Sequence, residues 1–184
     1  MIDLDAIPFV RARYYTPAKR SAADLIVIHA TQGQERAGST VNVAGGFQRG
    51  ERKASAHFVV DSRDVVQCVD TRDVAWHAFG VNRRGIGVEH CAMSEQTPEQ
   101  WEDADSAAEL SLSADLVAAL CMKWYIPARL VMADSLRAQS GRGITTHAIA
   151  SVAFPGHGGH WDPGPGFPLR AFIERVAAKM RGEG

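Results

Sequence analysis

The sequence predicts a single α/β domain over residues 1–184, with a central mixed β-sheet flanked by helices. Three observations predict this fold: short apolar runs rich in β-branched residues, longer stretches with helical spacing of apolar residues, and two runs joined by a short polar turn. The length suits one hydrophobic core. A hydrophobic fraction of 46% and a charged fraction of 22% are typical of a globular protein.

The first part of the chain supplies most of the expected strands. After an irregular segment over residues 1–23, the apolar run 25–29 predicts a buried strand. Residues 39–49 predict a short helix that two adjacent glycines weaken. The runs 56–60 and 65–69 are separated only by a polar turn, which predicts a β-hairpin.

A fourth strand and the longest helix follow. The alternating run 85–89 predicts the strand, and residues 98–124 predict the helix. Thr97 is the expected N-cap, because Pro98 suits the first helical position and acidic residues follow in the first turn. We also expect a break in this helix within residues 106–113.

The last third of the chain predicts a long loop between less regular elements. Residues 129–142 are ambiguous, with Leu136 and Arg137 on a possible short helix. A loop-rich stretch extends from residue 143 to Pro168 and contains five glycines between Gly156 and Gly166. Such a stretch inside a compact domain is more often functional than idle. An amphipathic helix over 169–180 closes the chain.

Charge and composition exclude several classes of protein. A net charge of -1 and a sequence pI of about 6.6 argue against a nucleic-acid partner, since such proteins usually carry a basic excess. The longest apolar runs fall short of the roughly 18 residues that a membrane span needs, so we expect no membrane insertion. The acidic N-terminus lacks the features of a signal peptide, which predicts a cytoplasmic protein. We expect a monomer.

The three cysteines are poor material for a disulfide framework or a zinc knuckle. Their number is odd and they lack CxxC spacing. Cys121 lies in the apolar helical stretch and is expected to be a buried core thiol.

Three histidines and one aspartate stand where chemistry is expected. His29 ends the first buried strand, His147 follows an expected strand, and His160 and Asp162 lie near the end of the glycine-rich loop. Imidazole nitrogens and a carboxylate oxygen are good zinc ligands, and two histidines with one acidic residue leave a position open for water. Spacing alone does not establish zinc, because the ligands are far apart and no HExxH motif is present.

Six short motifs, taken in order, resemble the type 2 N-acetylmuramoyl-L-alanine amidase family. The family includes amidase-type phage lysozymes, anhydro-muropeptide amidases and peptidoglycan-recognition proteins. The resemblance covers roughly residues 24–172. Its motifs are Ile26-Val27-Ile28-His29, Ser55-Ala56-His57-Phe58-Val59-Val60, Ala75-Trp76-His77-Ala78, Gly85-Ile86-Gly87-Val88-Glu89, Thr146-His147 and Asp162-Pro163-Gly164-Pro165.

The resemblance implies a Zn²⁺ ion held by His29, His147 and Asp162, with Glu89 as the active-site glutamate. Many relatives have Lys or Thr two residues before the last ligand, where this chain has His160. An imidazolium at that position could donate to developing negative charge and would make activity more sensitive to pH. The loop before Asp162 is longer than in bacterial relatives, which leaves His157 and His160 open as alternative third ligands. We favour Asp162, because Asp-Pro-Gly-Pro matches directly.

Several other polar residues have a structural interpretation beside a functional one. His57 lies in an alternating strand and is expected to be structural. His90 should point away from Glu89, on the opposite face of its strand. His157 is expected to be a solvated loop residue.

Three residues are candidates for substrate contact. The resemblance favours this role for Trp76 and His77, which could otherwise pack at a strand end. Arg83, next to Arg84, could pair with a stem-peptide carboxylate or belong to a solvated turn.

The resemblance therefore implies a zinc-dependent amidase that cuts the bond between the lactyl group of N-acetylmuramic acid and L-alanine. Peptidoglycan or a muropeptide would be the substrate. A phage or prophage endolysin that waits in the cytoplasm and reaches the wall after holin-type release is the first hypothesis. The alternatives are a cytosolic amidase that recycles anhydro-muropeptides and a non-catalytic peptidoglycan-recognition module. Zinc content would distinguish the enzyme from the recognition module.

Overall fold

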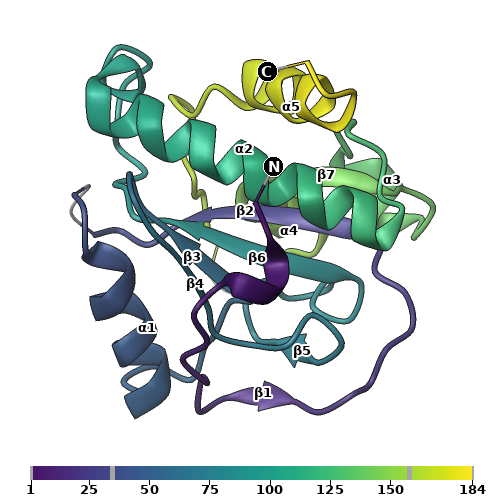
Figure 1. Ribbon diagram of the computed structural model, residues 1–184. Coiled ribbons are helices and arrows are strands. Elements are labelled where there is room, and N and C mark those ends of the chain that lie inside the picture. The colour runs from purple at the N-terminus through teal and green to yellow at the C-terminus, as the bar shows by residue number, and fades with distance from the viewer. Residues whose placement is uncertain (1, 34–35, 157–158, 184) are drawn as a thin grey trace.

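The computed structural model describes residues 2–33, 36–156 and 159–183, and it shows a single domain with a central mixed sheet flanked by helices (Figure 1). The strands are β1 (Tyr15–Thr16), β2 (Leu25–Ala30), β3 (Phe58–Val60), β4 (Val65–Gln67), β5 (Val74–Ala75), β6 (Gly85–His90) and β7 (Gly143–Thr146). The α-helices are α1 (Ser39–Arg49), α2 (Ala104–Trp124), α3 (Ala133–Arg137), α4 (His147–Ala153) and α5 (Leu169–Met180). Two short 3-10 helices, η1 (Leu4–Ala6) and η2 (Gln100–Glu102), complete the elements.

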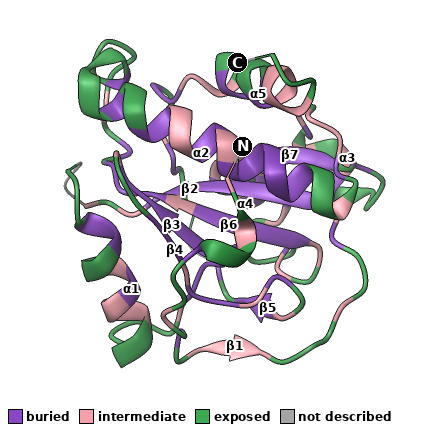
Figure 2. Cartoon of the chain, viewed as in Figure 1, coloured by how far each residue is buried: buried purple, intermediate pink, exposed green. Residues whose placement is uncertain are grey.

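The main sheet has five strands in the order β4-β3-β6-β2-β7. The expected hairpin is confirmed, since β3 and β4 pair antiparallel. The other pairs, β3–β6, β6–β2 and β2–β7, are parallel, so their carboxyl ends meet at one edge of the sheet. The strands are almost entirely buried (Figure 2), as expected where helices cover both faces of a sheet.

Even-numbered and odd-numbered residues of β2 and β6 point to opposite faces of the sheet. Ile26 and Ile28 pack with apolar residues of α2 and α5 on one face. Leu25 and Val27 pack on the other face with residues of α3 and α4. A third cluster joins that second face to α1. His29 follows the parity of Leu25 and Val27, so its side chain belongs to the face that α1, α3 and α4 cover.

The beginning of α2 differs from the prediction. The N-cap is Asp103, whose side chain accepts a hydrogen bond from the Ser106 backbone N–H, and Thr97 precedes the short helix η2 instead. The expected break over residues 106–113 is also absent, because α2 continues from Ala104 to Trp124. Cys121 is buried within it, as predicted.

Two segments expected to be irregular contain regular structure. The lead-in holds η1 and β1, and β1 pairs with β5 in a small antiparallel sheet. The loop-rich stretch is interrupted by α4, which begins directly after β7. Local pattern missed both, because β1 has only two residues and α4 only seven. Among the residues that the structure describes, no helix is both long and apolar enough to cross a bilayer.

Candidate active site

The carboxyl edge of the parallel strands positions the first two functional side chains. β2 lies between β6 and β7, and His29 of β2 is the direct register partner of Glu89 of β6. His147 follows the last residue of β7 and is the first residue of α4. Ligands commonly bind at this edge in open α/β sheets, where loops from neighbouring strands diverge.

The loop after α4 returns the third side chain to the same place. The Ala148 backbone N–H donates to the Asp162 carbonyl at 2.9 Å. Gly164 has φ +91°, and a Cβ there would lie 1.8 Å from the Ser94 carbonyl oxygen. Glycine therefore permits a close backbone approach that fixes the loop, which explains its place in the Asp-Pro-Gly-Pro motif.

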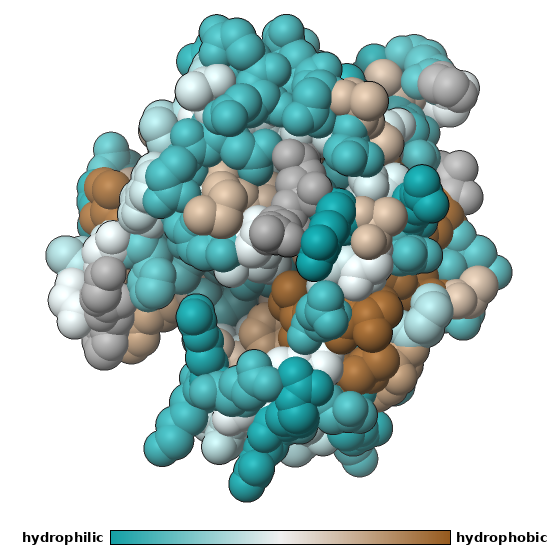
Figure 3. All heavy atoms as spheres, turned by 90° about the vertical axis from the view of Figure 1, so that its left-hand side faces the viewer, coloured by the Kyte–Doolittle hydropathy of each residue, from teal (hydrophilic) through white to brown (hydrophobic). Residues whose placement is uncertain are grey.

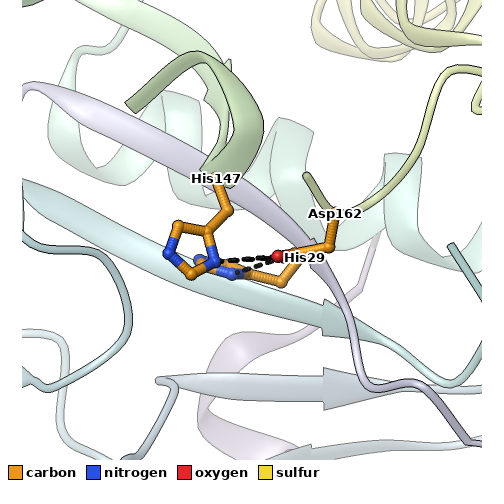
Figure 4. A group of neighbouring side chains, drawn as sticks. All are labelled: His29, His147 and Asp162. Atoms are coloured by element: carbon orange, nitrogen blue, oxygen red, sulfur yellow. Dashed lines mark hydrogen bonds and ion pairs between the residues drawn. The ribbon is translucent and has the colours of Figure 1, made fainter. Parts of the chain in front are cut away.

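His29, His147 and Asp162 form a compact buried group at this edge (Figure 4). His29 Nδ1 lies 3.1 Å from Asp162 Oδ2, and His147 Nδ1 lies 3.0 Å from Asp162 Oδ1. One ligand atom from each residue falls within 4.8 Å of the others. Two imidazole nitrogens and one carboxylate oxygen that converge in this way fit a zinc ion with one coordination position left open.

The electrostatics of the group suit a cation. Burial lowers the pKa of His29, which favours the neutral imidazole that a metal requires. Burial alone would raise the pKa of Asp162, but hydrogen bonding with His147 and His29 outweighs it and holds the pKa below its ordinary value. Asp162 is therefore ionised, and its negative charge lies between the two imidazole rings.

Glu89 offers a carboxylate beside this group. Its Oε2 atom is buried and has no hydrogen-bond partner within the described part of the chain. Burial, and then the charge of Asp162, raise the pKa of Glu89 to about 8, while Arg52 acts in the opposite direction. A carboxyl group with a pKa near neutrality can both accept and return a proton.

His160 lies at the exposed side of the group. Its ring stacks on the ring of His147, with centroids 4.2 Å apart and an interplanar angle of 16°. Burial and then the charge of His147 lower the pKa of His160. The ring therefore favours its neutral form over the imidazolium considered from the sequence, and a neutral imidazole still has one N–H to donate.

A cleft of about 890 Å³ opens onto these residues. Figure 3 views the end of the molecule that carries α1, where hydrophilic side chains surround a hollow with an apolar patch at one side. The lining includes Arg52 and Lys53, which follow α1, and the exposed aromatic residues Trp76, Phe79 and Trp161. Arg52, Lys53 and Phe79 were not expected, because no periodicity or motif marks these loop residues.

The three residues expected to contact substrate lie in different environments. Trp76 lines the cleft, is 39% exposed and donates through Nε1 to Thr16 Oγ1. His77 also lines the cleft but is only 9% exposed, and its Nδ1 lies 3.0 Å from His29 Nε2. Arg83 is exposed and is not among the residues that line the cleft, which favours the solvated-turn interpretation.

The two described histidines expected to be structural are buried and do not belong to the ligand group, although the His57 ring packs on His77 and His90 Nδ1 lies 3.2 Å from the His29 carbonyl oxygen. His57 Nδ1 accepts a hydrogen bond from the Gly87 backbone N–H. His90 packs on the opposite face from Glu89, against the rings of Trp101, Phe167 and Phe172. His157 lies outside the described residues.

Comparisons with known proteins relate this chain to N-acetylmuramoyl-L-alanine amidases. The family model described as N-acetylmuramoyl-L-alanine amidase matches residues 19–165. N-acetylmuramoyl-L-alanine amidase A of Achromobacter lyticus is 28% identical over 179 residues, which cover 92% of this chain and 90% of the relative.

Solved structures share the fold. The hydrolase AmiA of Staphylococcus aureus, in complex with its ligand, has a TM-score of 0.72 at 18% identity, over 99% of this chain and 88% of that one. A mutant endolysin from Bacillus subtilis has a TM-score of 0.56 at 18% identity over 100% of both chains. At this identity the likeness concerns the fold alone.

Proposed function

Because the chain belongs to the N-acetylmuramoyl-L-alanine amidase family, we propose that it uses zinc to hydrolyse the amide bond between the lactyl group of N-acetylmuramic acid and L-alanine. The observation that carries the proposal is the convergence of His29, His147 and Asp162 beside Glu89 at the cleft. A recognition module would need neither an open metal position nor a buried carboxyl group with a raised pKa.

The proposed mechanism assigns one proton carrier and one hydrogen-bond donor to the protein. A zinc ion held by His29, His147 and Asp162 would supply Lewis acidity, which would lower the pKa of a water molecule to about 7 and polarise the scissile carbonyl. Glu89 accepts a proton from the attacking water and returns it to the leaving amine. The ring N–H of His160 donates to the oxyanion as the carbonyl carbon becomes tetrahedral.

The cleft suggests how a muropeptide would be held. Trp76, Phe79 and Trp161 offer aromatic surfaces on which a sugar ring or a peptide side chain could pack. Arg52 and Lys53 place positive charge in the lining, where stem-peptide carboxylates would be attracted. We therefore assign peptide carboxylate binding to these two residues rather than to Arg83.

We further propose that the chain is the catalytic domain of a phage or prophage endolysin, residues 1–184 forming one amidase domain. The fold shared with a Bacillus subtilis endolysin supports this assignment. A cytosolic amidase that recycles anhydro-muropeptides would use the same chemistry on a smaller substrate.

Product analysis on two substrates tests both levels of the proposal. The protein is incubated with purified sacculi and, separately, with soluble anhydro-muropeptides, and new L-alanine amino termini are quantified. Faster release from sacculi is expected for an endolysin, and faster release from the soluble substrate would favour the recycling amidase. Binding to sacculi without any new amino terminus would contradict the amidase and favour the recognition module.

A further inference from the structure

His77 lies directly behind a proposed metal ligand. His77 Nδ1 is 3.0 Å from His29 Nε2, while His29 Nδ1 faces Asp162 on the other side of the ring. The two imidazole rings meet edge to face, with centroids 5.1 Å apart. We propose that His77 is a positioning residue that fixes the orientation and the tautomer of His29, and so sets the affinity for the metal ion. This inference rests on the metal site of the proposed function.

The sheet leaves a slot for the His77 ring. A Cβ atom at Gly87 would lie 2.7 Å from His77 Cγ, and one at Gly85 would lie 3.2 Å from His77 Cε1. Both glycines have the same parity on β6 as Glu89, so they share its face of the sheet. The alternation in Gly85-Ile86-Gly87 therefore has a steric reason, because any side chain at Gly87 would displace the ring.

The backbone of His77 is also held in place. The N–H groups of His77 and Ala78 donate to Asn82 Oδ1 at 3.0 Å and 2.7 Å. One amide side chain thus closes the turn that carries His77 toward the sheet. A buried ring on an anchored backbone, against a flat glycine surface, loses little further freedom when it holds a neighbouring ligand.

Only one tautomer of His29 suits a metal ion. A metal takes the unprotonated nitrogen of a neutral imidazole, and the proton then resides on the other nitrogen. His29 Nδ1 is directed to the ligand group, so His29 Nε2 carries the proton. Its N–H then donates a hydrogen bond to His77 Nδ1. His77 thereby favours the metal-binding tautomer of His29.

The test compares two substitutions that differ in one acceptor atom. In His77→Asn the side-chain oxygen takes the place of Nδ1, whereas His77→Phe fills the slot without an acceptor. Zinc affinity is measured by competition with a chromogenic chelator in the absence of substrate. We expect His77→Phe to bind zinc about 10- to 100-fold more weakly than the wild type, the usual loss when such a partner is removed. We expect His77→Asn to recover most of the affinity.

Two controls separate positioning from general damage. Leu120→Ala removes a buried side chain from the core on the opposite face of the sheet, away from His77, and it should leave zinc affinity unchanged. Thermal unfolding of the metal-free proteins should show that the His77 variants fold, and the absorption spectrum of the Co²⁺-loaded proteins should change in His77→Phe but much less in His77→Asn.

The outcomes distinguish this inference from the proposed function. Unchanged zinc affinity in a folded His77→Phe variant would overturn the positioning role, and a raised KM in that variant would then assign His77 to substrate contact. A wild type without zinc affinity would also overturn it. A third outcome is possible: the wild type binds zinc, His77→Phe binds it more weakly, and the wild type cleaves no peptidoglycan. This result would support the positioning role while contradicting the amidase.

Discussion

At the residue scale, the arrangement depends on the pairing of His29 with Glu89 across two parallel strands. The register makes them direct neighbours on one face, so a metal ion held by His29 and a proton carrier at Glu89 would act on the same water. Their roles differ, because His29 belongs to the ligand group and Glu89 does not. Separate substitutions should therefore give separable losses.

Glu89→Gln should abolish most catalysis and leave the metal site intact. The amide has the shape of the carboxylate but does not carry the proton from the attacking water to the leaving amine. We expect kcat to fall by about 10²- to 10⁴-fold, the usual contribution of general acid–base catalysis. Zinc content is the control. A variant with wild-type kcat, or one that loses its zinc, would contradict the assigned role.

His160→Ala should slow the reaction without removing the metal. Loss of one oxyanion donor typically lowers kcat by about 10²- to 10³-fold. His160→Lys is the matched variant, because an ammonium group also donates to the oxyanion, and it should retain most of the activity. Steady-state kinetics on a muropeptide checks both variants. Equal activity in the wild type and His160→Ala would show that the His160 ring does not stabilise the oxyanion.

The sequence marks these candidates more clearly than their surroundings. His29, Glu89 and His147 lie at or next to the carboxyl ends of strands and Asp162 lies in a distinctive motif, and the family resemblance implies their roles. The contact between His77 and His29 depends on a fold that joins residues 48 positions apart, and no local pattern reports it. Arg52 and Lys53 follow α1 and line the cleft together with residues from distant segments, which no local pattern reports.

At the element scale, the start of α2 shows how two good capping signals can compete. Thr97 followed by Pro98 has the chemistry of a helix start, and Thr97 Oγ1 does accept from the Gln100 N–H, at 3.4 Å. Asp103 accepts from the Ser106 N–H at 2.8 Å and starts the long helix. Trp101, which is 2% exposed, anchors the turn between them in the core.

Asp103→Ala should therefore destabilise the protein more than Thr97→Ala. Loss of an N-cap side chain costs about 1 kcal/mol, and the carboxylate also interacts favourably with the positive end of the helix. We expect Thr97→Ala to cost less than half of that, since its hydrogen bond is long and serves a single turn. Urea unfolding measures the free energy of unfolding of both variants. An equal loss, or a larger loss in Thr97→Ala, would contradict the start of α2 at Asp103.

At the scale of the whole molecule, the overall fold was largely predictable because the sheet is built from apolar runs with clear periodicity. The strand order was not, since parallel pairing joins segments far apart in the chain. β2 pairs with β6 and β7, whose residues lie about 60 and 118 positions later, as in Leu25 with Gly85 and Gly143. This pairing creates the edge at which the candidate site lies.

Buried neutral histidines should make the molecule sensitive to acid. Burial lowers the pKa of His57 to about 3 and that of His90 to about 4, against about 6.5 when unfolded. Between these values only the unfolded chain binds the proton, so the stabilising contribution is complete above pH 6.5 and is lost as the pH falls. We expect each histidine to contribute about 1.4 kcal/mol per pH unit within its window.

His90→Phe isolates one of these contributions, because a phenyl ring suits the aromatic surroundings of Trp101, Phe167 and Phe172. Urea unfolding of the metal-free wild type and variant between pH 7.5 and 4.5 should give a smaller slope of stability against pH for the variant. Parallel curves would show that His90 does not titrate with unfolding.

Zinc content and product, measured together in the wild type and in Asp162→Ala, test whether the proposed metal site hydrolyses the amide. Asp162 is the carboxylate that both proposed histidine ligands face, so its loss should disrupt the site. We expect about one equivalent of zinc and new L-alanine amino termini in the wild type, with both lost in the variant. Zinc and cleavage that survive in Asp162→Ala, or cleavage by a wild type freed of zinc, would contradict it.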